Sequence, residues 1–202
     1  MFATVDLPVL DCSRAAKEIL SLDDRVSFWD DYRYTKMIPL MTKLGRGSKA
    51  GTDNRNTGEF QWLSYTPTVI TEWFDQVVFP WTGMQSRVMA LITQPGISNH
   101  EHIDCDPHEL NTRQHKFRIV LQGSTDTLYF KTTAGDIAAP AVTGAFVMDG
   151  GWPHGMTNTS NDIKVTLALG APWTGKDSYD DLTLMMNRND YQMPVDLTSF
   201  WK

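Results

Sequence analysis

The chain is short of cysteine, of basic residues and of long apolar runs, and each shortage narrows what it can be. Only two of its 202 residues are cysteines, Cys12 and Cys105, so we expect no disulfide framework and a reducing, cytoplasmic location. Lysine and arginine number 18 against 24 acidic residues, and the resulting net charge of −6 disfavours nucleic-acid binding. The N-terminus has no signal-peptide pattern, and no apolar stretch approaches the roughly 20 residues that cross a membrane. We therefore expect neither a nucleic-acid nor a membrane partner.

What is present fits one globular domain with a substantial core. Hydrophobic residues make up 41% of the chain and charged residues 21%. We expect a single domain over 1–202, in which 1–86 form a mixed α/β support, 87–172 a β-rich core and 173–202 a tail. The tail begins polar and acidic, and we expect three apolar residues near its end to pack back on the body: Leu197, Phe200 and Trp201.

The first part of the chain predicts a strand at 4–10 and two helices. One helix runs from Ser13, which can cap it, to about residue 20, and the other covers 70–78, where Pro80 should end it. Between the helices, 43–58 is rich in Gly, Lys, Arg, Asn and Thr. Its glycine spacing does not match a phosphate loop, so we interpret it as a surface loop, with a lid over the site as the open alternative.

From about Arg87 the pattern changes to short strands separated by glycines, with no helix between them. This spacing predicts a sandwich, a jelly roll or a small barrel. The expected strands are 88–93, 116–121, 127–131, 145–148 and 163–169.

Four of the five histidines fall within sixteen residues, and this stretch contains His102 and Asp104. On a strand these two side chains share a face, and His154, after a glycine-rich approach, would have to arrive from another strand. Two imidazoles and one carboxylate can bind one face of an octahedral Fe(II) and leave three positions open. An isolated His-x-Asp pair is usually a surface feature, but together with His154 and Lys164 it favours a metal site.

The strand 163–169 alternates between an apolar face and a face with Lys164 and Thr166. If the second face lines the barrel interior, the amine and the hydroxyl can clamp a carboxylate. The alternative is that this face is exposed to solvent. Arg118 alternates with apolar residues in the same way and is a further candidate contact for such a carboxylate. A surface arginine fits the pattern as well.

The order His102-x-Asp104, then His154, then Lys164 ten positions later, resembles the iron(II)/2-oxoglutarate-dependent dioxygenases. The segments 143–149 and 154–159 are similar to the aspartyl/asparaginyl β-hydroxylase branch. That branch usually has arginine at the plus-ten position, whereas lysine there looks more like the prolyl hydroxylases. The resemblance covers about 88–172.

The resemblance implies a mainly β fold with flanking helices, a double-stranded β-helix or jelly roll. It implies that His102, Asp104 and His154 hold Fe(II), and that Lys164, supported by Thr166, binds the distal carboxylate of 2-oxoglutarate, with O2 at the remaining position. The enzyme would hydroxylate a C–H bond of an amino acid, a peptidyl residue or a small metabolite. The carboxylate of Asp104 favours hydroxylation over halogenation, because the related halogenases have a small residue there.

Two other classes remain open. A cupin-type isomerase or a non-enzymatic metal- or ligand-binding protein fits His100-Glu101-His102, but Glu109 is poorly spaced for a cupin and Lys164 would have no role. A structural protein with an inactive jelly roll is the other. The sequence fixes neither the prime substrate nor the oligomeric state.

Overall fold

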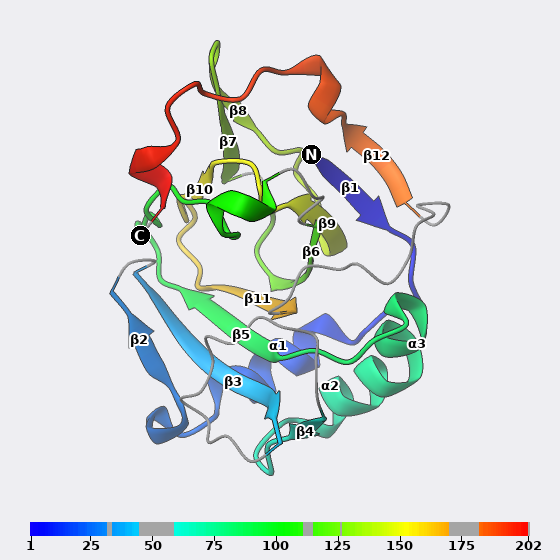
Figure 1. Cartoon of the computed structure of the whole chain (residues 1–202). Coiled ribbons are helices and arrows are strands. Elements are labelled where there is room, and N and C mark those ends of the chain that lie inside the picture. Colours follow the sequence, from blue (N-terminus) through cyan, green and yellow to red (C-terminus); the bar gives the residue numbers. More distant parts are fainter. Residues whose placement is uncertain (32–33, 45–58, 111–114, 126, 170–181, 202) are drawn as a thin grey trace.

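The structure is a computed structural model, and it describes residues 1–31, 34–44, 59–110, 115–125, 127–169 and 182–201. Most of the predicted loop 43–58 lies outside these residues. Two antiparallel sheets, one of nine strands and one of three, make up the β structure of the described residues (Figure 1).

Four strands in the middle of the larger sheet form one half of a jelly roll. They lie in the order β5 (Val88–Thr93), β11 (Lys164–Leu169), β6 (His115–Gln122) and β9 (Gly144–Asp149). Because each is hydrogen-bonded to strands distant in sequence, the chain must leave this sheet and return to it between them.

The other half is the smaller sheet, in the order β10 (His154–Met156), β7 (Leu128–Thr132) and β8 (Gly135–Ala138). The segment after β5 joins its edge through two isolated bridges, Ser98 with Thr157 and His102 with His154. The chain therefore passes repeatedly between the two sheets, as in a double-stranded β-helix. The predicted fold class is confirmed.

Strand β11 has the apolar face and the polar face that the alternating residues of 163–169 predict. Val165 and Leu167 lie in the larger apolar core together with Ala15, Ala16 and Ile19 of helix α1 (Cys12–Leu20). Lys164 and Thr166 point the other way and are buried between the sheets. The predicted strands at 88–93, 116–121, 127–131, 145–148 and 163–169 are all present, with ends that differ by at most one residue.

The N-terminal part supplies strands to both ends of the larger sheet. β1 (Phe2–Val5) pairs with β9 at one end, and β3 (Thr35–Lys43) pairs with β5 at the other, where β2 (Phe28–Asp30) and β4 (Phe60–Trp62) pair with β3. The predicted strand at 4–10 was wrong in extent, because the strand ends at Val5.

The caps of the helices also differ from the prediction. Helix α1 is capped by Asp11, whose carboxylate accepts the N–H of Arg14, and not by Ser13. Pro80 does not end the second helix: α2 (Thr68–Trp73) continues through a π-helical stretch, Phe74–Val78, into α3 (Phe79–Thr82). The wider π turn just before the proline makes room for the ring and for the missing N–H.

The described part of the tail lies against the body of the domain. Strand β12 (Leu182–Met186) pairs with β1 at the edge of the larger sheet. The last turn, Thr198–Phe200, brings the Phe200 carbonyl to the N–H of Ile103 at 3.1 Å, and the indole N–H of Trp201 donates to the Cys105 carbonyl at 2.8 Å. Among the described residues no helix is both long and apolar enough to cross a membrane.

Candidate metal centre

Backbone pairing brings His102, Asp104 and His154 together. His102 and His154, the first residue of β10, exchange N–H···O bonds in both directions, at 2.9 and 3.0 Å. Two residues after His102, the N–H of Asp104 donates to the Gly150 carbonyl at 2.8 Å, and this bond fixes the backbone that carries the Asp104 carboxylate. The predicted meeting of a histidine from a distant strand with the His-x-Asp pair is therefore present in the structure.

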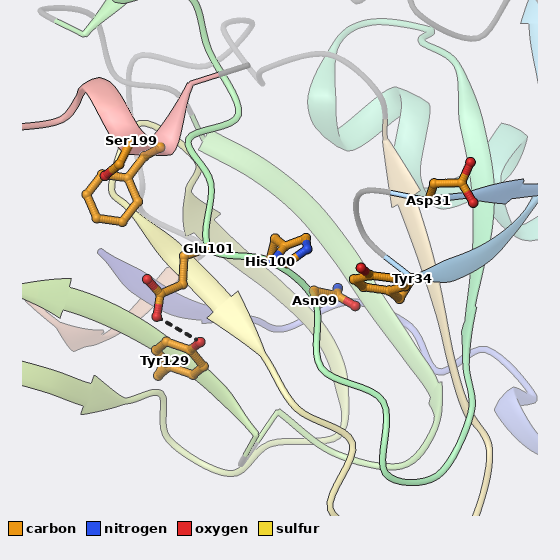
Figure 2. A pocket seen from close by; sticks show the side chains of 8 residues that line it. Asp31, Tyr34, Asn99, His100, Glu101, Tyr129 and Ser199 are labelled. Atoms are coloured by element: carbon orange, nitrogen blue, oxygen red, sulfur yellow. Dashed lines mark hydrogen bonds between the residues drawn. The ribbon is translucent and has the colours of Figure 1, made fainter.

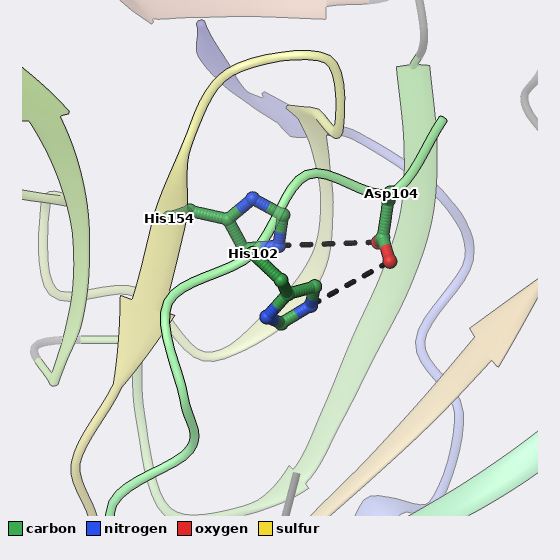
Figure 3. A group of neighbouring side chains, drawn as sticks. All are labelled: His102, Asp104 and His154. Atoms are coloured by element: carbon green, nitrogen blue, oxygen red, sulfur yellow. Dashed lines mark ion pairs between the residues drawn. The ribbon is translucent and has the colours of Figure 1, made fainter. Parts of the chain in front are cut away.

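The side chains of these residues point at one another, as Figure 3 shows. One ligand atom from each lies within 4.8 Å of the other two. His102 Nε2 is 3.5 Å from Asp104 Oδ1, and His154 Nε2 is 3.9 Å from Asp104 Oδ2. Ligands about 2.1 Å from a metal on one octahedral face lie about 3 Å apart, so small side-chain adjustments would close the group around an ion.

A backbone carbonyl next to each imidazole decides which ring nitrogen is free to face a metal. His102 Nδ1 lies 2.7 Å from the His100 carbonyl, and His154 Nδ1 lies 2.8 Å from the Trp152 carbonyl. Because a carbonyl only accepts, each Nδ1 carries the hydrogen, and each Nε2 presents its lone pair toward Asp104. Burial, and next the charge of the neighbouring His102, lower the pKa of His154 to about 3, so this ring is neutral and able to coordinate near pH 7.

The sequence left open whether Arg118 on β6 faces the interior or the surface. In the structure it lies inside, next to Asp104. Its Nη2 is 3.4 Å from Asp104 Oδ2, and its Nη1 donates to the carbonyls of Leu169 at 3.0 Å and Phe117 at 3.2 Å. The guanidinium is thus held by the backbone of β6 and β11 and can orient the carboxylate.

Lys116 lies near the same carboxylate, and the sequence reasoning missed it. It is buried two positions before Arg118 on β6, and burial lowers its pKa while Asp104 raises it. Gly150 makes the close packing possible, since a Cβ there would lie 2.8 Å from Lys116 Cγ and 3.0 Å from Asp104 Cβ. The alternation that singled out Arg118 also carried the signal for Lys116.

An inner cavity of about 90 Å³ lies between the sheets beside this centre. Its lining includes the three candidate ligands and also the three residues expected to bind a co-substrate: Arg118, Lys164 and Thr166. Lys164 is only 5% exposed, and its ammonium group donates to the hydroxyl of Thr127 at 3.3 Å. Thr127, just before β7, had no signal in the sequence. The cavity therefore combines a metal-ligand set with a buried cation.

Four other aromatic and histidine side chains of the β-rich core lie outside the group of candidate ligands. Trp152 is a core residue whose indole N–H donates to the Lys131 carbonyl at 2.7 Å. His108 is exposed on a short 3₁₀ turn, and His100 is also exposed. Tyr129 does not line the inner cavity but donates its hydroxyl hydrogen to Glu101 at 3.2 Å.

The sequence matches no protein-family model and no curated protein. Among solved structures, similar ones include a prolyl-4-hydroxylase from Pseudomonas putida, 13% identical, with a TM-score of 0.48 over 83% of this chain and 89% of that one. A 2OG-Fe(II) oxygenase family protein from Burkholderia pseudomallei is 10% identical, with a TM-score of 0.48 over 81% of this chain and 80% of that one. A cupin domain from Bordetella pertussis is 17% identical, with a TM-score of 0.29 over 41% of this chain and 77% of that one. Similarities at this level do not reveal a substrate or an activity.

Proposed function

We propose that this protein is an Fe(II)- and 2-oxoglutarate-dependent oxygenase that hydroxylates a C–H bond of an amino acid, a peptidyl residue or a small metabolite. One observation carries the proposal. His102, Asp104 and His154 place a ligand atom each within 4.8 Å of the others, in the wall of a cavity that also contains the buried ammonium group of Lys164. A metal-ligand triad and a cation in one cavity suit a metal-chelating diacid.

The donor set fits iron. Two neutral imidazoles and one carboxylate are the set that leaves three open positions on a non-haem ferrous ion. When bound, iron supplies O2 activation coupled to the oxidation of 2-oxoglutarate. The chain's own part is to hold His102 and His154 in one tautomer through their Nδ1 contacts.

We assign the co-substrate contact to Lys164, with Thr166 beside it on the same face of β11. A buried ammonium group needs an anionic partner, and the distal carboxylate of 2-oxoglutarate supplies one. Arg118 would act mainly through Asp104, since its Nη2 already lies 3.4 Å from that carboxylate and its Nη1 is bonded to backbone carbonyls.

The cupin alternative has less support from the geometry. A cupin-type site would use His100 together with His102, but the His100 side chain is exposed, and its carbonyl oxygen lies against His102 Nδ1. Among the described residues, the group close enough to hold an ion contains His102, Asp104 and His154. A cupin would also leave Lys164 without a function.

The proposal is tested by adding Fe(II) and 2-oxoglutarate to the protein without oxygen. We expect a metal-to-ligand charge-transfer absorption that His154→Ala abolishes. Lys164→Ala should raise the Kd for 2-oxoglutarate about ten- to a hundredfold, the range expected for a lost hydrogen bond to a charged group, with a smaller effect on iron. Lys17→Ala, at an exposed position of α1, is the matched control and should change neither. A folded wild-type protein without the absorption would refute the proposal.

A further inference from the structure

A second, larger hollow, the outer pocket, adjoins the inner cavity. Its volume is about 630 Å³, and Figure 2 shows the side chains around it. Asn99 lines both spaces, and Tyr34 of the outer pocket is followed directly by Thr35 of the inner cavity. His100 and Glu101, in its wall, immediately precede the candidate ligand His102. A molecule in the outer pocket is therefore next to the proposed iron centre.

The sizes of the two spaces assign their occupants. A cavity needs about 10–15 Å³ to hold one water molecule, so the inner cavity of about 90 Å³ has room for one small diacid but not for a second organic molecule. The outer pocket falls within the roughly 300–1,000 Å³ of ordinary small-molecule sites. If 2-oxoglutarate fills the inner cavity, the molecule to be oxidised has to lie in the outer one.

The lining of the outer pocket favours positive charge. It has two carboxylates, Asp31 and Glu101, and among the described residues no lysine or arginine lines it. Glu101 is paired with Lys131 at 3.0 Å, but that lysine is shared with Asp136 at 2.8 Å. Among the described side chains this group has three carboxylates and one ammonium group, and such an excess of negative charge attracts a cation and repels an anion.

Aromatic rings occupy much of the rest of the lining: Tyr34, Tyr129 and Phe200, with the imidazole of His100. The faces of such rings attract ammonium and guanidinium groups. Tyr34 and His100 are in contact, with their ring centroids 5.1 Å apart. A carboxylate-and-ring lining is the combination that recognises an organic cation.

The backbone at Tyr34 supports a functional use of this wall. Its φ is +45°, and among the described residues it is the only non-glycine with a positive φ. A bulky side chain in this region costs about 1–3 kcal/mol and is found where the surrounding structure has a use for it. Here the strained conformation places the Tyr34 ring beside His100 and near Asn99, at the point where the two spaces meet (Figure 2).

We propose that the outer pocket is the prime-substrate site and that it selects a substrate with an ammonium or guanidinium group. The inference rests on the proposed function, because it takes the iron centre as the place of reaction. The charged group would come from a free basic amino acid or from a basic side chain in a peptide. It would sit between the carboxylates and rings while a neighbouring C–H bond reaches past Asn99 toward the centre.

The test compares lysine with norleucine, which lacks the side-chain ammonium group, each as the free amino acid and at the middle of a capped glycine pentapeptide. Calorimetric titration of the anaerobic protein with Fe(II) and 2-oxoglutarate should give an affinity for the lysine probe about fivefold higher in at least one pair, falling at high salt. Preference in the free pair identifies a small-molecule substrate, and preference in the peptide pair a peptidyl one. Equal affinities in both pairs would overturn the inference.

Two conservative variants locate the preference. Asp31→Asn and Glu101→Gln should each reduce it about twofold, and the double variant should remove most of it. Asp6→Asn, an exposed carboxylate that does not line the pocket, is the control and should leave it unchanged. If the folded double variant still prefers lysine, the ammonium group is recognised at another site, and this result also overturns the inference.

The two proposals fail separately. The charge-transfer absorption with Fe(II) and 2-oxoglutarate tests the oxygenase function and does not depend on the two carboxylates of the outer pocket. Repeating the titrations without iron and 2-oxoglutarate judges the outer pocket alone, and the preference for lysine should persist there. If the absorption is present and the preference absent, only the assigned substrate class is wrong.

Discussion

Mild acid should destabilise the metal-free protein through His154. This histidine is buried as a neutral ring with a pKa of about 3, whereas in the unfolded chain its pKa is near the ordinary 6.5. Below pH 6.5 the unfolded state therefore binds a proton that the folded state does not bind until about pH 3. The contribution of His154 to stability is complete above pH 6.5 and is lost as the pH falls from 6.5 to 3.

The size of this effect follows from the same two pKa values. One proton taken up only by the unfolded chain lowers the free energy of unfolding by about 1.4 kcal/mol per pH unit. Because the loss begins near pH 6.5, the contribution of His154 falls by about 2 kcal/mol between pH 7 and pH 5. Such a change is a large fraction of the roughly 5–15 kcal/mol that stabilises an ordinary domain.

Urea unfolding at pH 7 and pH 5 measures this loss. The wild-type protein should lose about 2 kcal/mol more than His154→Gln, which has no ring to protonate. His108→Gln, at an exposed histidine, is the matched control and should behave as the wild type does. If the wild type and His154→Gln lose the same free energy between the two pH values, the reasoning from the buried neutral imidazole is refuted.

Two further substitutions test packing. Gly150→Ala should weaken metal binding about tenfold, because the new Cβ would lie 3.0 Å from Asp104 Cβ and 2.8 Å from Lys116 Cγ. A Co(II) titration measures the affinity, and an unchanged affinity would contradict the predicted crowding. Leu167→Ala should lower the free energy of unfolding by about 3 kcal/mol, because Leu167 is fully buried in the larger core. Urea unfolding measures this change, and a loss below about 1 kcal/mol would mean that the surrounding residues move in around the smaller side chain.

Sequence reasoning succeeded where the pattern is local. The alternation on 163–169 placed Lys164 and Thr166 opposite Val165 and Leu167, and the structure has them on opposite faces of β11. The short strands of the core and the order of the three candidate ligands were also readable, because strand period and turn glycines act over a few residues.

The parts that were missed depend on contacts between distant segments. β3 was not predicted. It contains Pro39, a residue that interior strands usually lack, and the structure accommodates the proline at a register shift between Pro39 and Met41. Nothing local marks the pairing of β1 with β12, which closes one end of the sheet. The place of Lys116 beside Asp104 depends on Gly150, which approaches from another part of the chain.

The end of the chain is tied to the centre although it supplies no ligand. Phe200 and Trp201 hold the peptide groups of Ile103 and Cys105, the two neighbours of Asp104, at 3.1 and 2.8 Å. A premature stop or a proteolytic cut after Val195 would leave His102, Asp104 and His154 in place and still remove two of the hydrogen bonds that hold the segment around the carboxylate. An intact motif in a shortened gene product is therefore no guarantee of a working centre.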